Sequence, residues 1–84
     1  MEVLKFFTDT CVPCKKVTNL LETKFPDLHV VPIDALEEPE MAEKYDVIAT
    51  PTLVFVENGR EKARLLGLVK ESEIQEVLEK AKAL

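Results

Sequence analysis

The sequence contains two cysteines, Cys11 and Cys14, which lie two residues apart. An apolar run that ends at Phe7 precedes them and an amphipathic run follows them, so they fall at the junction of a strand and a helix. A C-x-x-C motif at such a junction, in a chain of alternating strands and helices, is typical of a thiol–disulfide redox site. The sequence therefore predicts chemistry at sulfur, with the rest of the chain as its scaffold.

The two cysteines are expected to have different roles. A thiolate is the form that attacks a disulfide, and a cysteine at a helix start faces free backbone N–H groups and the positive end of the helix dipole. Lys15 and Lys16 add positive charge nearby, which favours the thiolate further. We therefore predict that Cys11 attacks the target disulfide and that Cys14, one turn further along, attacks Cys11 and releases the reduced target.

Composition narrows the class of protein. The chain has 84 residues, enough for one domain over residues 1–84, and its formal net charge of -5 argues against nucleic acid or an anionic membrane as a partner. The start at Met1 lacks the basic residues of a signal peptide, and no apolar run reaches bilayer length, so we expect a cytoplasmic protein. Cytosolic cysteines are normally reduced, which favours a catalytic or metal-binding pair over a structural disulfide. A zinc site would need four ligands, whereas the cysteines and His29 supply three at most.

Apolar periodicity and turn residues predict seven elements. Glu2–Phe7 has apolar residues at both odd and even positions, which suits a central strand covered on both faces. The next strand, His29–Ile33, is expected at a sheet edge because Pro32 cannot donate to a ladder. Asn58-Gly59 predicts a tight hairpin. The other predicted elements are helices from about Val12 to Phe25, Pro39 to Tyr45 and Lys70 to Ala83, and strands Thr52–Val56 and Glu61–Leu66.

The first and last of these helices are predicted to cover the same face of the sheet. Each has one apolar stripe, formed by Val17, Leu20, Leu21 and Phe25 in the first and by Ile74, Val77, Leu78 and Ala81 in the last. Ser72 with Gln75 predicts a capping box that starts the last helix slightly later. The cations of the last strand, Arg60, Lys62 and Arg64, are expected to be solvated charges that protect a sheet edge from aggregation.

At this point the chain resembles the thioredoxin/glutaredoxin superfamily. Three features carry the resemblance over nearly the whole chain: Cys11-Val12-Pro13-Cys14 after the first strand, Thr50-Pro51-Thr52 before the third, and Gly67 before the last helix. The resemblance implies an α/β, thioredoxin-like fold of minimal, glutaredoxin size. It would have a four-stranded mixed sheet with three helices, in the order β-α-β-α-β-β-α.

The resemblance also implies how a substrate would bind. Pro51 would follow a cis bond beside the cysteines, and Thr50 would pair through its backbone with the bound substrate strand. Together with these two residues, Val12 and Pro13 of the motif would contact the substrate.

The chain departs from its relatives at several places, among them Thr10, where thioredoxins usually have Trp before the first cysteine. Thioredoxins usually have a buried Asp six residues before the first cysteine, and here that position is Lys5. We predict that Lys5, like Lys15 and Lys16, modulates the thiol pKa; the alternative is that its stem crosses apolar surface and its ammonium reaches water. In addition, Gly67-Leu68-Val69-Lys70 does not match the Gly-Gly-x-Asp pattern with which glutaredoxins hold glutathione.

The resulting prediction is a protein dithiol–disulfide oxidoreductase with thioredoxin-like activity. It would need no cofactor beyond the Cys11–Cys14 redox pair and no metal, and would act as a monomer on protein disulfides with a thioredoxin-reductase-type or other dithiol reductant. Two alternatives stay open: a glutathione-dependent glutaredoxin, and a non-enzymatic iron–sulfur or metal carrier of the kind some glutaredoxin relatives form.

Overall fold

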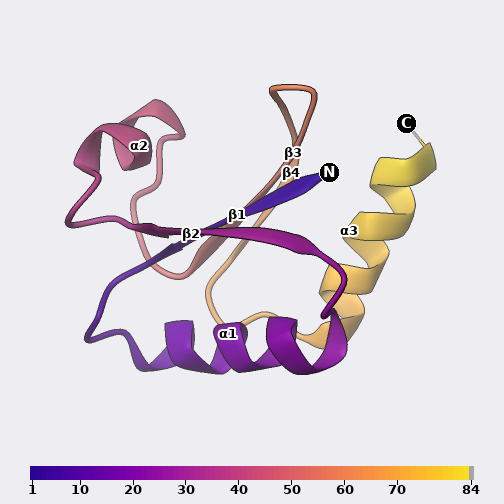
Figure 1. Cartoon of the computed structure of the whole chain (residues 1–84), viewed down its shortest axis with the longest axis horizontal. Coiled ribbons are helices and arrows are strands. Elements are labelled where there is room, and N and C mark those ends of the chain that lie inside the picture. Colours follow the sequence, from indigo (N-terminus) through magenta and orange to yellow (C-terminus); the bar gives the residue numbers. More distant parts are fainter. Residues whose placement is uncertain (84) are drawn as a thin grey trace.

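Four strands and three helices make up the fold in a computed structural model, which describes the backbone of residues 1–83 and the side chains of residues 1–80 (Figure 1). The predicted order β-α-β-α-β-β-α is confirmed. The elements are β1 (Glu2–Phe7), α1 (Val12–Lys24), β2 (His29–Asp34), α2 (Pro39–Lys44), β3 (Thr52–Glu57), β4 (Arg60–Leu66) and α3 (Glu71–Ala83).

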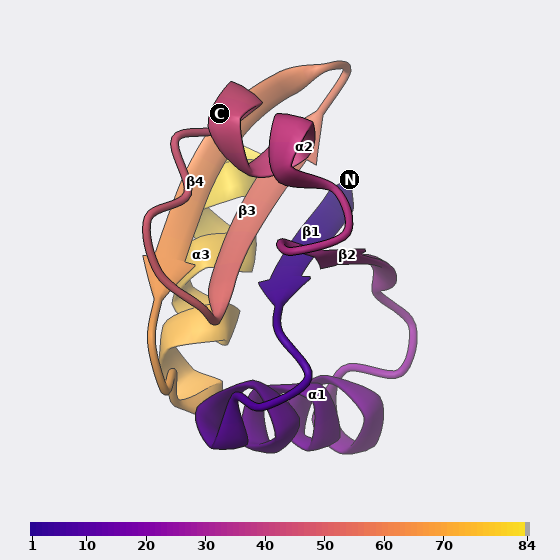
Figure 2. The same cartoon turned by 90° about the vertical axis from the view of Figure 1, so that its left-hand side faces the viewer.

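The sheet has the strand order β2-β1-β3-β4, with β1 parallel to β2 and antiparallel to β3. β1 is therefore central and β2 is an edge, as the apolar pattern and Pro32 predict. The chain leaves the end of β1 by a short loop that leads directly into α1 (Figure 2). The cysteine motif thus follows a strand that is paired on both sides.

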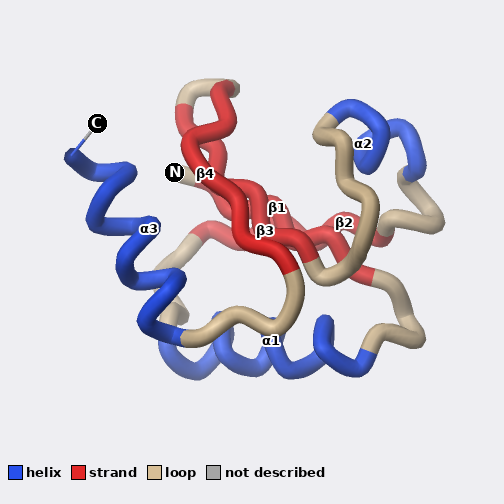
Figure 3. The backbone as a smooth tube through the Cα atoms, turned by 180° about the vertical axis from the view of Figure 1, so that it is seen from behind, coloured by secondary structure: helices blue, strands red, loops and turns tan. Residues whose placement is uncertain are grey.

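Helices cover the two faces of the sheet unequally, with α2 on one side of the strands and α1 on the other (Figure 3). The α1 and α3 side packs Val17, Leu21 and Ile74 against Val3 and other strand residues, which confirms that these two helices share a face. The α2 side is centred on the alternate strand residues Leu4, Phe6, Ile33, Val54 and Val56. The side chain of Ala81, predicted on the α3 stripe, lies outside the described residues.

Alternation along β1 determines where Lys5 points. Leu4 and Phe6 face α2, and Val3 belongs to the cluster beneath α1 and α3. Because successive side chains of a strand point to opposite faces, Lys5 lies on the same side as Val3. Lys5, where the resemblance implies a carboxylate, is therefore directed toward α1.

Asn58 and Gly59 form the predicted hairpin turn. Both have left-handed backbone angles, with φ of 53° and 78°, as a two-residue turn of type I′ requires. Further along β4 the register shifts: Phe55 pairs with Ala63 but Val56 pairs with Glu61, so that β4 carries one extra residue. This β-bulge changes which side chains of β4 point to the α2 side of the sheet.

The start of α3 lies within one residue of the predicted Lys70, but the way the helix is capped differs from the prediction. The helix begins at Glu71, and the carboxylate of Glu73 accepts the backbone N–H of Lys70 at 2.9 Å. The Ser72–Gln75 capping box is wrong, because Ser72 already lies in the first turn of the helix. In the part of the chain that the structure describes, no helix has the length and apolar character needed to cross a membrane.

Candidate functional site

Cys11 is the N-cap of α1. Its backbone is extended (φ -84°, ψ 105°) and its Sγ accepts the backbone N–H of Cys14 at 3.1 Å. A sulfur thus takes the place that a Ser, Thr or Asp oxygen usually occupies at a helix start. The N–H of Cys11 in turn donates to the carbonyl of Thr8 at 3.2 Å, which anchors the loop after β1. The helix start therefore directs a donor at the sulfur where negative charge must develop.

The two sulfurs are joined in a disulfide, with the Cα atoms of Cys11 and Cys14 5.2 Å apart. Cys11 is partly exposed, whereas Cys14 is only 3% exposed. Val12 and Pro13 between them are exposed, and Pro13 lies in the first turn, where its missing N–H leaves no helical bond unmade. One sulfur is thus accessible to a partner and the other is not.

The segment before β3 approaches the cysteine loop. Thr8 lines a hollow of about 280 Å³ together with Ile48, Ala49 and Thr50. The Thr50–Pro51 bond is cis, as the resemblance implies, and Pro51 is fully buried while Thr50 is partly exposed. The structure therefore brings Thr50 close to the loop that holds Cys11.

Two hydrogen bonds hold this segment at its β3 end. The hydroxyl of Thr52 donates to the carbonyl of Ala49 at 2.7 Å, and the N–H of Gly67 donates to the carbonyl of Pro51 at 2.9 Å. Gly67 has a φ of 78°, a left-handed conformation that favours glycine. The cysteine motif, the Thr50–Pro51 bond and Gly67, which together suggested the resemblance, therefore all lie at the same end of the sheet.

Lys5 lies beside the second cysteine. It lines a pocket of about 320 Å³ with Cys14, Thr18, Lys15 and Asp9, whereas Lys16, which is exposed like Lys15, does not line it. Its Nζ donates to the hydroxyl of Thr18 at 2.8 Å. Burial lowers the pKa of the Lys5 ammonium, and the carboxylate of Glu22 opposes this effect. The ammonium is thus held on α1 at Thr18, one helical turn after Cys14, and Lys5 stays only partly buried.

A metal site is not favoured by these positions. His29 stands opposite Glu2 at the start of β1 and lies 3.6 Å from its carboxylate, whereas the cysteines follow the end of β1. The three ligands that the sequence offers for zinc are therefore at opposite ends of the strand. Within the described residues, no group of three or more His, Cys, Asp or Glu side chains is placed to hold a metal ion.

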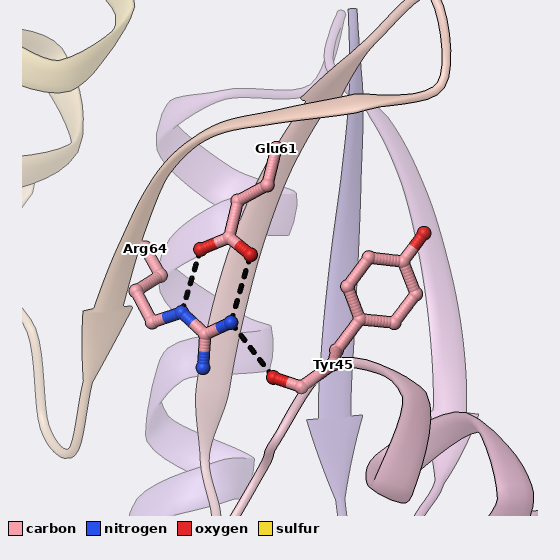
Figure 4. Close-up of polar contacts among 3 residues, drawn as sticks. All are labelled: Tyr45, Glu61 and Arg64. Atoms are coloured by element: carbon pink, nitrogen blue, oxygen red, sulfur yellow. Dashed lines mark hydrogen bonds and ion pairs between the residues drawn. The ribbon is translucent and has the colours of Figure 1, made fainter.

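Sequence reasoning missed two contacts near this site. Thr18 lies four residues after Cys14, so helical spacing alone predicts that both share one face of α1. Arg64 was expected to be a solvated edge charge, but it binds the carboxylate of Glu61 and the backbone carbonyl of Tyr45 (Figure 4). No local pattern indicates that contact, because 19 residues separate Arg64 from Tyr45.

Comparisons with known proteins agree with this geometry. The family model named Thioredoxin matches residues 1–80. Thioredoxin H5 of rice is 43% identical over 68 residues, which cover 77% of this chain and 50% of that protein. The thioredoxin of Chlamydia trachomatis is 35% identical over 69 residues, covering 79% of this chain and 68% of that protein. This chain thus spans about half the length of the rice relative.

Solved structures give the same result. The structure of thioredoxin 1 from the thermophilic eubacterium Thermosipho africanus superposes with a TM-score of 0.85 at 25% identity. The match covers 99% of this chain and 96% of that one. The small size of the fold is therefore shared with a solved relative.

Proposed function

We propose that this chain, which belongs to the thioredoxin family, is a dithiol–disulfide oxidoreductase that acts on disulfide bonds in other proteins. One observation carries the proposal: a partly exposed Cys11 caps α1, with Cys14 buried one turn behind it. Family membership supports the same activity. It also favours this reading over a glutathione-dependent glutaredoxin or a metal carrier.

The reaction follows from the two environments. In the reduced protein the Cys11 thiolate attacks one sulfur of the target disulfide, which forms a mixed disulfide and releases the other target sulfur as a thiolate. Cys14 then loses its proton and attacks the Sγ of Cys11. This step re-forms the Cys11–Cys14 disulfide and releases the second target sulfur. Two electrons pass to the target, and the released thiolates take up two protons.

The backbone supplies the stabilisation of Cys11. Its Sγ already accepts the N–H of Cys14 at 3.1 Å, and the positive end of the α1 dipole favours a thiolate at that position. The pocket that Cys14 lines contains two cations, Lys5 and Lys15, and one acid, Asp9, so positive charge exceeds negative charge on the side of the second sulfur. The reaction needs no cofactor other than this pair of sulfurs.

The target polypeptide would bind across the exposed side of Cys11. Val12 and Pro13 are exposed beside it, and Thr50 and Pro51 belong to the neighbouring segment. In this proposal the backbone of Thr50 pairs with the substrate strand. The protein would act as a monomer in the cytoplasm, where a thioredoxin-reductase-type enzyme or another dithiol regenerates its reduced form.

The experiment is a choice of electron source. Reduction of the disulfides of insulin by this protein is measured with NADPH and a thioredoxin reductase, and separately with glutathione and glutathione reductase. We expect turnover with thioredoxin reductase or a dithiol and little with glutathione, because Gly67-Leu68-Val69-Lys70 lacks the glutathione-binding pattern. Fast, saturable turnover with glutathione would identify a glutaredoxin, and coloured, iron-containing protein that leaves insulin unreduced would identify a carrier.

A further inference from the structure

The segment proposed to receive substrate begins at α2, which is weakly attached to the sheet. None of the six side chains of Pro39–Lys44 is buried. Contact with the sheet comes from partly buried residues such as Met41 and Tyr45, and the ring of Tyr45 lies 6.0 Å from that of Phe6. Apolar packing alone therefore holds this helix less firmly than it holds α1.

Arg64 on β4 adds a polar attachment at the end of α2 (Figure 4). Its Nε and Nη2 donate to the two carboxylate oxygens of Glu61 at 2.6 and 2.8 Å. The same Nη2 donates to the backbone carbonyl of Tyr45 at 2.7 Å. The hydrogen bond from Arg64 lowers the pKa of Glu61, so the pair is charged at neutral pH. A planar guanidinium fixed at two points has a defined direction for its third bond.

The β-bulge in β4 makes this arrangement possible. Residues 61 and 64 of a regular strand point to opposite faces. Because β4 carries an extra residue, Glu61 pairs with Val56 and Arg64 with Val54, both of which face α2. The bulge thus directs the acid and the base to the same side, and re-aiming a side chain is a recurrent use of β-bulges.

The carbonyl that Arg64 binds marks the end of α2. Asp46 has a left-handed φ of 52°, and the N–H groups of Asp46 and Val47 donate to the carbonyls of Glu43 and Ala42. These backbone hydrogen bonds cap the C-terminus of α2 without help from any side chain. The carbonyl of Tyr45 lies just beyond them, at the point where the chain turns toward Thr50.

We propose that Arg64 is a positioning residue that fixes residues 46–51 for the binding of a protein substrate. This inference deepens the proposed function and rests on it. At its other end the segment is held through Ala49 and Pro51, as described above. With Arg64 in place both ends are fixed, and a substrate strand that pairs with Thr50 meets a backbone that is already ordered. A small disulfide that reacts at Cys11 alone does not need that order.

The test compares Arg64→Met with Arg60→Met, which removes the same cation from the exposed end of the same strand. For Arg64→Met we expect the KM for insulin to rise about tenfold, the loss typical of one charged hydrogen bond, with kcat changed less than about twofold. The rate with a small aromatic disulfide should stay within about twofold of the wild-type rate. Arg60→Met should change none of these values.

Two further variants and one physical measurement complete the test. Arg64→Lys keeps the charge but loses the planar guanidinium that binds Glu61 and Tyr45 at the same time, so it should resemble Arg64→Met. Full rescue by lysine would overturn the inference in favour of a simple charge effect. Glu61→Gln, which keeps the shape of the side chain, should raise the KM for insulin by a smaller factor. Amide hydrogen exchange of residues 46–50 should accelerate in Arg64→Met relative to Arg60→Met.

Failure of this inference is distinct from failure of the proposed function. If the wild-type protein reduces insulin and Arg64→Met has the wild-type KM and exchange rates, Arg64 has no positioning role. Equal losses with insulin and with the small disulfide would show a general structural role and would also overturn the inference. If the wild-type protein reduces neither disulfide, the proposed function is wrong, and the exchange measurement still decides whether Arg64 orders the segment.

Discussion

Replacing Lys5 with methionine removes one positive charge from the pocket that Cys14 lines and leaves the stem almost unchanged. In the wild-type protein the ammonium is held by the hydroxyl of Thr18 at 2.8 Å, on the same face of the sheet as α1. A positive charge beside a thiol favours the thiolate, so Lys5→Met should raise the pH at which the Cys11–Cys14 pair loses its first proton. It should also slow the attack by Cys14 near neutral pH, because less of that thiol is ionised.

The magnitude has an upper bound from Coulomb's law. At about 7 Å and an effective dielectric constant of about 20, the attraction between ammonium and thiolate is about 2 kcal/mol, equivalent to about 1.5 pKa units. The pocket is open to solvent, which screens part of this attraction. We therefore expect Lys5→Met to raise the thiol pKa by about one unit or less. Thr18→Val, which frees the ammonium without removing it, should give a smaller change in the same direction.

The stability of the oxidised protein provides an independent readout of Lys5. Burial lowers the pKa of Lys5 below its ordinary value of 10.5, so the unfolded chain binds this proton more tightly than the folded one. The contribution of Lys5 to the free energy of unfolding therefore rises with pH, from the lowered pKa of the folded state up to about 10.5. Below that range the ammonium is charged in both states and the cost of burying it is present in full. The variant has no such group, so wild-type stability should rise relative to Lys5→Met as the pH passes through this alkaline range.

The assay follows thiolate ultraviolet absorbance against pH in the reduced wild-type protein, Lys5→Met and the control Lys16→Met. Lys16 was predicted from the sequence to influence the thiols as well, but it is an exposed cation of α1 that does not line the pocket, so its replacement should have the smaller effect. Superimposable curves for wild type and Lys5→Met would refute the reasoning and leave the Lys5 charge without influence on the sulfurs. Equal displacements for Lys5→Met and Lys16→Met would refute it too, since net charge rather than position would then account for the effect.

Two other predictions concern the cysteines and the last helix. Cys14→Ser should accumulate a stable mixed disulfide with a protein substrate while Cys11→Ser should trap none, as non-reducing electrophoresis will show; a trap in Cys11→Ser would reverse the assigned roles. Glu73→Ala should lower the free energy of unfolding by about 0.5–1 kcal/mol, because it removes the carboxylate that accepts the N–H of Lys70. Denaturant unfolding measures this loss, and an equal loss in Glu79→Ala, further along α3, would contradict a specific capping role.

Much of the fold could be predicted because its signals are local. Pro32 identifies an edge strand, Asn58-Gly59 a hairpin, and the motif from Cys11 to Cys14 a helix start, and the structure confirms all three. Each signal acts through the backbone angles or hydrogen bonds of its own few residues. Such effects depend little on the rest of the molecule.

The missed features depend on partners that are distant in sequence or on half of a motif. The start of α3 has half of a capping box: the carboxylate of Glu73 accepts the N–H of Lys70, but the side chain of Lys70 caps nothing. Because a capping box is recognised by its Ser or Thr, the sequence pattern indicates Ser72 instead. The bond from Arg64 to Tyr45 requires a β-bulge in one strand and the end of a helix 19 residues away. The residues next to Arg64 in the sequence indicate neither the bulge nor the position of the helix end.

The unequal cover of the sheet separates two kinds of sequence change. Substitutions beneath α1 and α3 disturb fully buried residues such as Val17, Phe55 and Ile74, and with them the strand that carries the cysteines. Substitutions in Pro39–Lys44 replace no buried side chain, and only Met41 and Ala42 of this helix pack against the buried residues on the α2 side. Sequence changes at the exposed positions of this short helix therefore leave intact the core beneath α1 and α3 and the strand that leads to the cysteines.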